Sequence, residues 1–340
     1  MPKLTTRQKI LHEDCDFILQ KSPVDWQLLR NSNILLTGGT GYYGKWFLAS
    51  FLHINKTLQL HANLYVVSRS PENFFKNYTV FQEHKDLTFI KGDVRTFSFP
   101  KGEFNYVIHA ATEVATTQER DAPEEMLSVS EHGTKHVLDF AKEAGVKKLL
   151  LTSSGAIYGP QPPELEFMPE TYKGKPTTVY GKAKKISEDM CLASDVNCSI
   201  ARCYASVGPW LRLDAQYAIG NFILNVLKNE PIIIKSDGRP YRSYLYTADL
   251  ISWLWTILIN GKTGEPYNVG SEHAVSILEL AQITLYSINK NLSVKVLGIP
   301  NLSVPAPRYV PSTYKAHQEL LLNQSRTLTE SISRTIQQLM

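Results

Sequence analysis

The chain is poor in cysteine, in long hydrophobic runs and in charge of one sign. Its 340 residues include four cysteines, and no two of them form a C-x-x-C pair. This spacing does not support a zinc site or a thioredoxin-type redox site, so we expect no metal and buried thiols in a reducing compartment. No apolar run approaches the roughly 20 residues that a bilayer-spanning helix needs, so we expect no membrane partner.

The charges of the chain are nearly balanced. Its 36 basic and 32 acidic residues give a formal net charge of +4, and no run of basic residues forms a stripe. A nucleic-acid partner is therefore not expected. The first residues include Glu13, Asp14 and Asp16 and lack the apolar region of a signal peptide, so a cytoplasmic location is expected.

Short apolar runs alternate with helical patterns from about residue 31 onward. This alternation predicts a parallel sheet covered by helices on both faces, a Rossmann-type doubly wound α/β domain. Ligands of such sheets bind at the carboxyl ends of the strands. The expected strands are 33–37, 64–68, 87–90, 106–109, 148–152 and 199–202, and the clearest expected helices are 44–53, 124–144 and 179–193.

We expect three parts in the chain. Residues 1–30 predict a helical N-terminal extension, because apolar residues recur there near helical spacing. Residues 31–205 predict the large domain, to which 240–275 are expected to return. Proline punctuates the rest, so 206–239 and 276–340 predict a smaller C-terminal α+β substrate-binding lobe. Helices are expected there and in the returning segment at 216–228, 247–260, 277–288 and 314–322, with short strands at 231–235 and 293–297.

A glycine-rich turn lies between the first expected strand and helix. Gly38, Gly41 and Gly44 have the spacing G-x-x-G-x-x-G. In dinucleotide-binding domains the first glycine makes the tight turn, the second lets the backbone approach the pyrophosphate, and the third lets the helix pack against the strand. The strand–turn–helix setting therefore favours a dinucleotide site over a purely structural turn, and the site is expected to include Thr40, Tyr42 and Tyr43.

The end of the second strand bears on the choice of cofactor. An acidic residue there holds the ribose 2′-hydroxyl of NAD, whereas a nearby arginine accommodates the 2′-phosphate of NADP. The chain has Ser68 and Arg69 and no acid at this point, which favours NADP over NAD unless Arg69 is merely a solvated loop residue. After the third strand, Asp93 and Val94 are expected to contact the adenine, although Asp93 alone also suits a turn.

Tyr180 and Lys184 are the candidate catalytic pair. Residues four apart share one face of a helix, so the ammonium of Lys184 is expected to lie near the phenol of Tyr180 and lower its pKa from about 10. Such a phenol can act as general acid and base. Ser154 follows the strand 148–152 and can donate to a carbonyl oxygen or to the phenolate, while Ser153 has the opposite orientation. A tyrosine at the edge of the core and a solvated lysine are the alternative interpretation.

These motifs resemble those of extended short-chain dehydrogenases/reductases, specifically the nucleotide-sugar epimerases and dehydratases. The similarity runs from about residue 33 to residue 316 and is specific for the superfamily rather than for the reaction. Its main pieces are TGGTGYYG at 37–44, GDV at 92–94, HAA at 109–111, TSSGAIYG at 152–159, YGKAK at 180–184, RCYASVGP at 202–209, NFI at 221–223, RSYLYTADL at 242–250 and YNVG at 267–270.

The resemblance implies a role for each matching residue. In such enzymes the bound nicotinamide oxidises the C4 hydroxyl of the sugar, which makes Tyr180 the base, Ser154 the group that polarises the oxygen and Lys184 the partner of the ribose. Ala110, Ala111 and Thr112 would line the nicotinamide. Arg242, Asn221 and Arg308 would contact the phosphates of a nucleotide-diphosphate sugar, and Glu113 and Ser153 would lie near the sugar. Family members are commonly dimeric, so a homodimer is expected.

The sequence also departs from the family pattern. Family 4,6-dehydratases carry an Asp-Glu pair after the catalytic threonine, where this chain has Gly155 and Ala156, neither of which transfers protons. The usual asparagines of two other motifs are Ala205 and Ser130 here. These departures disfavour 4,6-dehydration. A nucleotide-sugar 4-epimerase is the simplest expectation, a 4-keto-sugar reductase that consumes NADPH is the alternative that Arg69 favours, and a dehydratase of altered mechanism comes third. A non-catalytic dinucleotide sensor is the least favoured alternative, because all three catalytic residue types are present.

Overall fold

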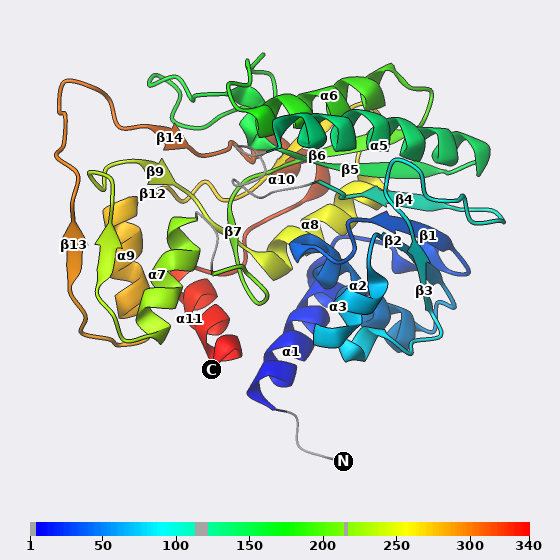
Figure 1. The fold of residues 1–340 in the computed structure, drawn as a ribbon, viewed down its shortest axis with the longest axis horizontal. Coiled ribbons are helices and arrows are strands. Elements are labelled where there is room, and N and C mark those ends of the chain that lie inside the picture. The colour runs from blue at the N-terminus through cyan, green and yellow to red at the C-terminus, as the bar shows by residue number, and fades with distance from the viewer. Residues whose placement is uncertain (1–4, 113–121, 214–216) are drawn as a thin grey trace.

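A seven-stranded sheet forms the centre of the molecule, which a computed structural model describes over residues 5–112, 122–213 and 217–340 (Figure 1). Its strand order is β11-β6-β5-β4-β1-β2-β3, and every neighbouring pair is parallel. The chain runs outward from β1 on one side and from β4 on the other, so the switch point lies between β1 and β4. The strands are β1 (Asn33–Thr37), β2 (Asn63–Ser68), β3 (Leu87–Lys91), β4 (Tyr106–His109), β5 (Lys148–Ser154), β6 (Cys198–Cys203) and β11 (Pro266–Val269).

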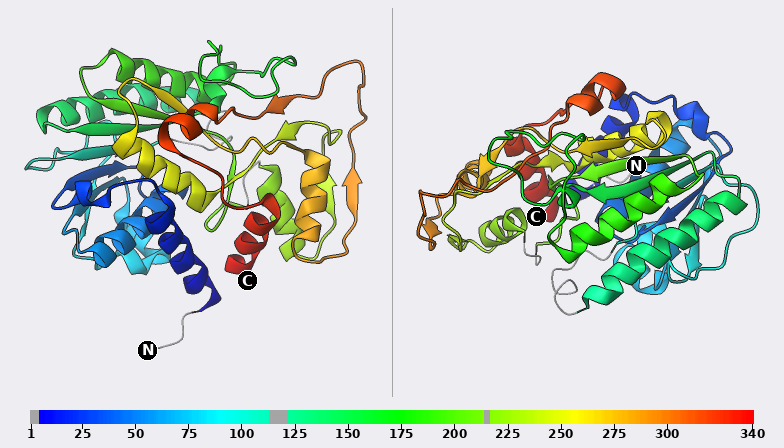
Figure 2. Two further views of the ribbon diagram at one scale, coloured as in Figure 1. Left: turned by 180° about the vertical axis from the view of Figure 1, so that it is seen from behind. Right: turned by 90° about the horizontal axis from the view of Figure 1, so that it is seen from above.

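Helices cover both faces of this sheet, as Figure 2 shows from two further directions. Successive side chains of a strand point to opposite faces, so one strand feeds two hydrophobic cores. On β1, Leu35 joins the core beneath α5 and α6, whereas Ile34 and Leu36 join the core beneath α2 and α8. The Rossmann-type doubly wound fold is thereby confirmed. The covering helices are α2 (Tyr42–Leu58), α3 (Pro71–Asn77), α5 (Pro123–Glu143), α6 (Val179–Ala193) and α8 (Thr247–Asn260).

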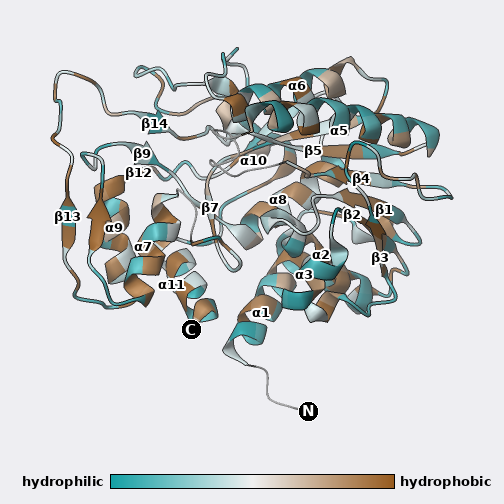
Figure 3. Cartoon of the chain, viewed as in Figure 1, coloured by the Kyte–Doolittle hydropathy of each residue, from teal (hydrophilic) through white to brown (hydrophobic). Residues whose placement is uncertain are grey.

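A smaller lobe stands beside the sheet and has its own hydrophobic core, visible as the brown faces of its elements in Figure 3. Ile223, Ile232, Leu280 and Ile332 are among its buried members. The lobe contains α7 (Ala218–Leu227), α9 (Ile277–Tyr286), α11 (Leu328–Leu339), β8 (Ile232–Ile234) paired with β13 (Val294–Val296), and a small sheet in the order β12 (Val275–Ser276), β9 (Tyr241–Arg242), β14 (Arg308–Tyr309).

The chain crosses between the two parts more than once. β11 joins the main sheet beside β6, and α10 (Tyr314–Leu320) packs against β11. Two short strands, β7 (Ser206–Val207) and β10 (Leu245–Tyr246), pair where the chain crosses between the parts. The exact bounds of the domains stay a prediction. Within the described ranges, no helix is both long and apolar enough to cross a membrane.

The N-terminal extension is a helix, α1 (Thr6–Lys21), that is tied to the C-terminal helix α11. Asp14 of α1 is fully buried and accepts hydrogen bonds from Tyr246 at 2.6 Å and from Arg334 of α11 at 2.8 Å. Arg326 lies 3.3 Å from the same carboxylate. The carboxylate therefore joins the first and last helices, and the extension is an integral part of the packed structure.

Candidate active site

The glycine-rich turn has the tight geometry that its sequence predicts. Gly38 has a φ of +73°, and a Cβ added to it would lie 2.5 Å from the carbonyl of Ala110, the residue that follows the neighbouring strand β4. A Cβ on Gly44 would lie 2.3 Å from the carbonyl oxygen of Gly38, so α2 packs directly on the turn. Gly41 caps α2 without a side-chain hydrogen bond, and the first turn of this helix carries no acidic residue. Its free N–H groups and positive dipole end suit a pyrophosphate.

The residues expected around the adenine end have partners inside the protein. Asp93 accepts two hydrogen bonds from the Arg95 guanidinium, at 2.8 Å and 3.0 Å, and these bonds hold the pKa of its carboxyl below the ordinary value. Arg69 is exposed and lies close enough to add to this effect. Ser68 is buried at the end of β2, and Val94 is buried against Gly133 of α5. A contact of Asp93 or Arg69 with a cofactor stays a prediction.

A buried polar chain supports the segment expected to line the nicotinamide. The ring of His109 bonds to Thr37 at 2.8 Å and to Thr134 at 3.1 Å, and Thr37 accepts from the N–H of Ala111 at 3.2 Å. Burial lowers the pKa of His109 to about 3, so this imidazole stays neutral. It positions the Ala110–Thr112 backbone and does not transfer protons.

Ser154 and Tyr180 meet at the carboxyl end of β5. Thr178 caps the N-terminus of α6 by accepting from the N–H of Gly181 at 3.0 Å, and the helix therefore begins with Tyr180 in its first turn. The hydroxyl of Ser154 is hydrogen bonded to the phenol of Tyr180. The structure thus brings the two residues together as the sequence predicts.

Lys184 lies beneath this pair with its side chain buried. Its ammonium donates to the Thr112 hydroxyl and to the Thr152 carbonyl, both at 2.6 Å, and lies 5.9 Å from the centre of the Tyr180 ring. Burial lowers the pKa of Lys184 to about 8. The lysine links the end of β5, the nicotinamide segment and Tyr180, as the expected constellation requires.

The expected lowering of the Tyr180 pKa is wrong for the protein in this state. Burial raises the pKa of Tyr180 well above its ordinary value, and the Ser154 hydrogen bond offsets only part of this rise. Lys184 is not among the main influences, because its ammonium lies on the ring side and is bound to Thr112 and Thr152. The phenol is therefore protonated, and it needs another nearby cation before it can accept a proton.

A second tyrosine, which the sequence did not single out, reaches the same serine. The phenol of Tyr309 on β14 is hydrogen bonded to Ser154, and burial raises the pKa of Tyr309 to about 12. Its ring lies 4.5 Å from the ring of Tyr204 at 34°. The only sequence signal was its position beside Arg308, in a stretch that matches the family.

Tyr204 explains the glycine that follows Ser154. A Cβ added to Gly155 would lie 2.5 Å from the Cζ atom of the Tyr204 ring, a distance that side-chain carbons do not tolerate. The phenol ring therefore occupies the volume that a carboxylate side chain at this position would need. The packing of Tyr204 against Gly155 therefore accounts for the absence of an acidic side chain at this position.

Ser153 faces a different set of partners. Its hydroxyl donates to Glu188 at 2.5 Å, and Glu188 forms a buried ion pair with Arg202 at 2.8 Å. Arg202 continues the network to Tyr158 at 2.8 Å. Ser153 thus has a partner within the protein, and a contact with substrate stays a prediction that this geometry does not favour.

The two arginines of the expected phosphate clamp lie on neighbouring strands but not in register. Tyr309 pairs with Arg242, and Arg308 pairs with Tyr241. Residues paired in register share a face of a sheet, so Arg242 lies on the side of Tyr309 and Ser154, whereas Arg308 lies with Tyr241. Guanidinium-to-ring distances of 6.0 Å and 4.8 Å agree with this assignment. Arg242 is therefore the better placed of the two, and a joint clamp stays a prediction.

For four further residues of the expected site, a contact with cofactor or substrate stays a prediction. Asn221 is exposed on α7, and Thr40 is partly exposed in the turn. Tyr42 bonds through its phenol to Thr247, and Tyr43 lies beside Tyr42 with ring centres 5.5 Å apart. Glu113 lies outside the described residues.

The chain resembles known proteins over most of its length. A model of the NAD dependent epimerase/dehydratase family matches residues 34–270. UDP-glucuronic acid decarboxylase 1 of Danio rerio is 26% identical over 345 residues, covering 97% of this chain and 78% of that protein. The corresponding Xenopus tropicalis protein is 27% identical over 291 residues, covering 82% and 65%.

Solved structures agree on the fold. The UDP-glucuronic acid 4-epimerase of Bacillus cereus, in complex with UDP-glucuronic acid and NAD, has a TM-score of 0.77 at 20% identity and covers 91% of this chain and 100% of its own. The dTDP-glucose 4,6-dehydratase of Bacillus anthracis, in complex with NAD, has a TM-score of 0.74 at 20% identity and covers 90% and 96%. Because the family model spans most of the chain, the protein belongs to the NAD dependent epimerase/dehydratase family and is an NAD(P)-dependent enzyme.

Proposed function

We propose that the protein is a 4-epimerase of a nucleotide-linked hexose. One observation carries the proposal: beside Ser154 and Tyr180, a Cβ at Gly155 would lie 2.5 Å from the Tyr204 ring, so this position has no room for the carboxylate that elimination needs. A 4,6-dehydration requires acid–base groups that remove a proton at C5 and protonate the leaving hydroxyl at C6. Epimerisation at C4 requires a single proton acceptor and donor, which Tyr180 supplies.

The chemistry is redox-neutral overall. A nicotinamide dinucleotide held by the Gly38–Gly44 turn and Lys184 would supply the hydride acceptor and donor for C4. Once a nearby cation has lowered the pKa of Tyr180, its phenolate takes the proton of the C4 hydroxyl as the C–O bond becomes a ketone, and it returns the proton to that oxygen when C4 is reduced again. Ser154 donates a hydrogen bond to the oxygen while charge builds on it. The product is an isomer of the substrate, so the cycle consumes no reductant.

The remaining residues position the reactants. Through its hydrogen bonds to Thr152 and Thr112, Lys184 holds the carboxyl end of β5 beside the segment that would line the nicotinamide. Its ammonium also suits the ribose hydroxyls of a dinucleotide. Arg242, on the side of Tyr309, suits a diphosphate because a guanidinium presents paired donors to phosphate oxygens. NADP remains the favoured form of the cofactor at Arg69, with NAD as the alternative, although the relatives' solved structures hold NAD.

Decarboxylation of a nucleotide-linked uronic acid is a second candidate, because several relatives bear that name. Oxidation at C4 turns a uronic acid into a β-keto acid, which loses CO2 and then needs a proton at C5. An acid would have to deliver that proton, and the described part of the site offers phenols for the task. A 4-keto-sugar reductase that consumes NADPH remains the third candidate.

One set of assays separates the three. The purified enzyme is incubated with UDP-glucose, with UDP-glucuronic acid and with a nucleotide 4-keto-6-deoxyhexose plus NADPH, and the products are followed by NMR, CO2 release and nicotinamide absorbance. We expect the C4 epimer to appear without CO2 release and without net NADPH oxidation. Release of CO2 with a pentose product would establish the decarboxylase, and stoichiometric NADPH consumption the reductase.

The Tyr180→Phe variant tests the catalytic role itself. Phenylalanine keeps the ring packing and removes only the hydroxyl. Loss of general acid–base catalysis is expected to lower kcat by about 100-fold or more with the fold unchanged. Full activity of this variant would overturn the proposed mechanism for every one of the three reactions.

A further inference from the structure

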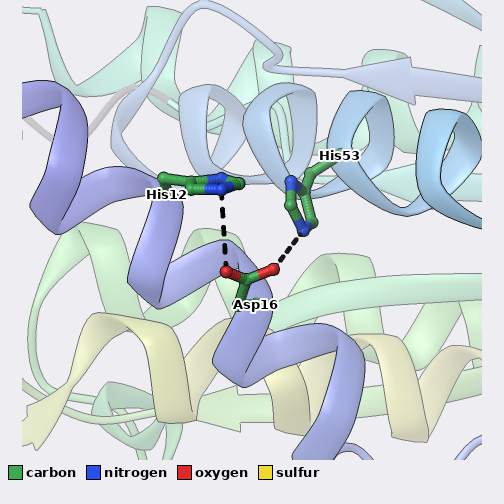
Figure 4. A group of neighbouring side chains, drawn as sticks. All are labelled: His12, Asp16 and His53. Carbon is green, nitrogen blue, oxygen red and sulfur yellow. Dashed lines mark hydrogen bonds and ion pairs between the residues drawn. The ribbon is translucent and has the colours of Figure 1, made fainter. Parts of the chain in front are cut away.

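Three potential metal ligands converge where the N-terminal helix crosses α2. His12 and Asp16 lie four residues apart on α1, so their side chains share one face of that helix. His53 projects from α2 toward the same point, as Figure 4 shows. Each residue offers one ligand atom, and these atoms all lie within 4.8 Å of one another. The cluster shares no residue with the Ser154–Tyr180–Lys184 site.

The spacing of the ligand atoms is close to that of a tetrahedral metal site. Bonds of about 2.0–2.1 Å to zinc place neighbouring ligand atoms about 3.3 Å apart. Here the Nε2 atom of His53 lies 2.8 Å from one oxygen of Asp16, and the Nε2 atom of His12 lies 3.8 Å from the other oxygen. Small side-chain rotations would bring both distances to about 3.3 Å. The exposed side chain of His12 has the most room to rotate.

His12 brings a second imidazole to the carboxylate that His53 already contacts. A hydrogen bond between His53 and Asp16 would by itself fasten α1 to α2. His12 adds a second imidazole whose ring meets that of His53 edge to face, with centres 5.0 Å apart, and whose Nε2 also turns toward the carboxylate. Two imidazoles and one carboxylate form a common ligand set for zinc, with a fourth position left for water.

We propose that His12, Asp16 and His53 form a binding site for a divalent transition-metal ion of the zinc class. Calcium and magnesium are poor candidates, because they prefer oxygen ligands. The bound ion cross-links α1 to α2 and thereby holds the N-terminal extension on the dinucleotide-binding domain. The bound ion adds to the anchoring of α1 at Asp14. This proposal departs from the expectation from sequence that the chain has no metal site, which considered cysteine spacing alone.

The test uses the full chain without an affinity tag of histidines, treated with EDTA and dialysed. Binding of Zn²⁺ is followed by calorimetry, and binding of Co²⁺ by the visible absorption that distinguishes tetrahedral from octahedral coordination. We expect one ion per chain, an intense tetrahedral cobalt spectrum, and a thermal midpoint that rises with Zn²⁺ concentration. These readouts do not involve turnover, so they stand or fall separately from the proposed epimerase activity.

Two variants and one control assign the ligands. His12→Ala removes an exposed side chain, and Asp16→Asn keeps the side-chain shape, so at least one is expected to fold normally by circular dichroism. Either change should weaken Zn²⁺ binding at least tenfold and abolish the rise of the thermal midpoint. His132→Ala, at an exposed histidine of α5, should leave both unchanged. No saturable binding to the parent protein, or undiminished binding by the folded variants, would overturn the proposal.

Discussion

Tyr309 is hydrogen bonded through its phenol to Ser154, the hydroxyl that also contacts Tyr180. The two tyrosines come from β14 and α6, which are more than a hundred residues apart in the chain. Both phenols have raised pKa values because both are buried. Ser154 is therefore held from two sides, and its orientation toward the substrate oxygen depends on a residue outside the Ser–Tyr–Lys motif.

Tyr309→Phe tests this dependence. Removal of the phenol frees Ser154 to rotate while the aromatic packing on Tyr204 is retained. We expect kcat to fall by about tenfold, the size of one hydrogen bond of about 1.4 kcal/mol, with a smaller change in KM. Steady-state kinetics across pH should show a changed kcat profile if Tyr309 positions the serine.

Tyr204→Phe is the matched control for Tyr309→Phe. The Tyr204 hydroxyl is buried and has no hydrogen-bond partner within the described ranges. Its removal is expected to leave kcat unchanged and to keep or slightly raise stability, because a buried unpaired hydroxyl is costly. Equal losses of activity in the two variants would show that aromatic packing, rather than the Ser154 hydrogen bond, is what matters.

Gly155→Ala tests whether the ring of Tyr204 excludes side chains beside Ser154. The new methyl group would meet the ring 2.5 Å away, and overpacking of a rigid site costs about 1–3 kcal/mol. We expect the urea midpoint of unfolding to fall accordingly. In the background of Tyr204→Ala the same glycine substitution should cost much less, and strictly additive effects in this double-mutant cycle would contradict the steric argument.

Sequence reasoning recovered the features that depend on local spacing. The strand at 33–37, the helix at 179–193 and the turn at Gly38 follow from apolar periodicity and from backbone requirements within a few residues. The pairing of Ser154 with Tyr180 follows because the carboxyl ends of parallel strands and the starts of the following helices meet at one edge of the sheet.

The missed features depend on contacts between distant segments or on burial. Tyr309 lies on a strand of two residues whose position is fixed by pairing with β9, which no local pattern predicts. His53 meets His12 only because α1 packs across α2. The pKa of Tyr180 was predicted in the wrong direction, because the sequence showed the neighbouring lysine but not the depth of burial. The capping box that begins α11, formed by Thr327 and Glu330, is a local signal for a helix that the expected elements did not include.

The raised pKa of Asp249 is expected to make the free energy of unfolding depend on pH. This buried carboxyl accepts from Ser325 at 2.6 Å, its other oxygen has no partner among the described residues, and burial raises its pKa from 3.8 to about 6. A raised folded-state pKa means that the folded protein binds this proton more tightly than the unfolded chain. The contribution to stability is therefore complete below pH 3.8 and is lost as the pH rises through about 6.

Asp249→Asn should remove this loss while its amide oxygen still accepts from Ser325. Relative to the parent protein, the variant is expected to gain about 2 kcal/mol in unfolding free energy between pH 4.5 and pH 7.5. Urea unfolding at the two pH values measures the difference, in which other titrating groups cancel. A variant whose relative stability is the same at both would show that Asp249 titrates normally.

The Lys184→Met substitution separates the loss of stability caused by burying the Lys184 ammonium from the contribution of this lysine to kcat. Burial lowers the Lys184 pKa from 10.5 to about 8, so the folded protein binds this proton less tightly than the unfolded chain. The penalty of burying the ammonium is complete below pH 8 and declines as the pH rises toward 10.5. Methionine fills a similar volume without a charge. We therefore expect kcat to fall by about 100-fold or more, while the stability of the variant relative to the parent is greater at pH 7 than at pH 9.5 by about 2 kcal/mol. Denaturant unfolding at both pH values tests this, and a relative stability that did not change with pH would mean that the buried lysine stays charged at both pH values, as an ordinary lysine does.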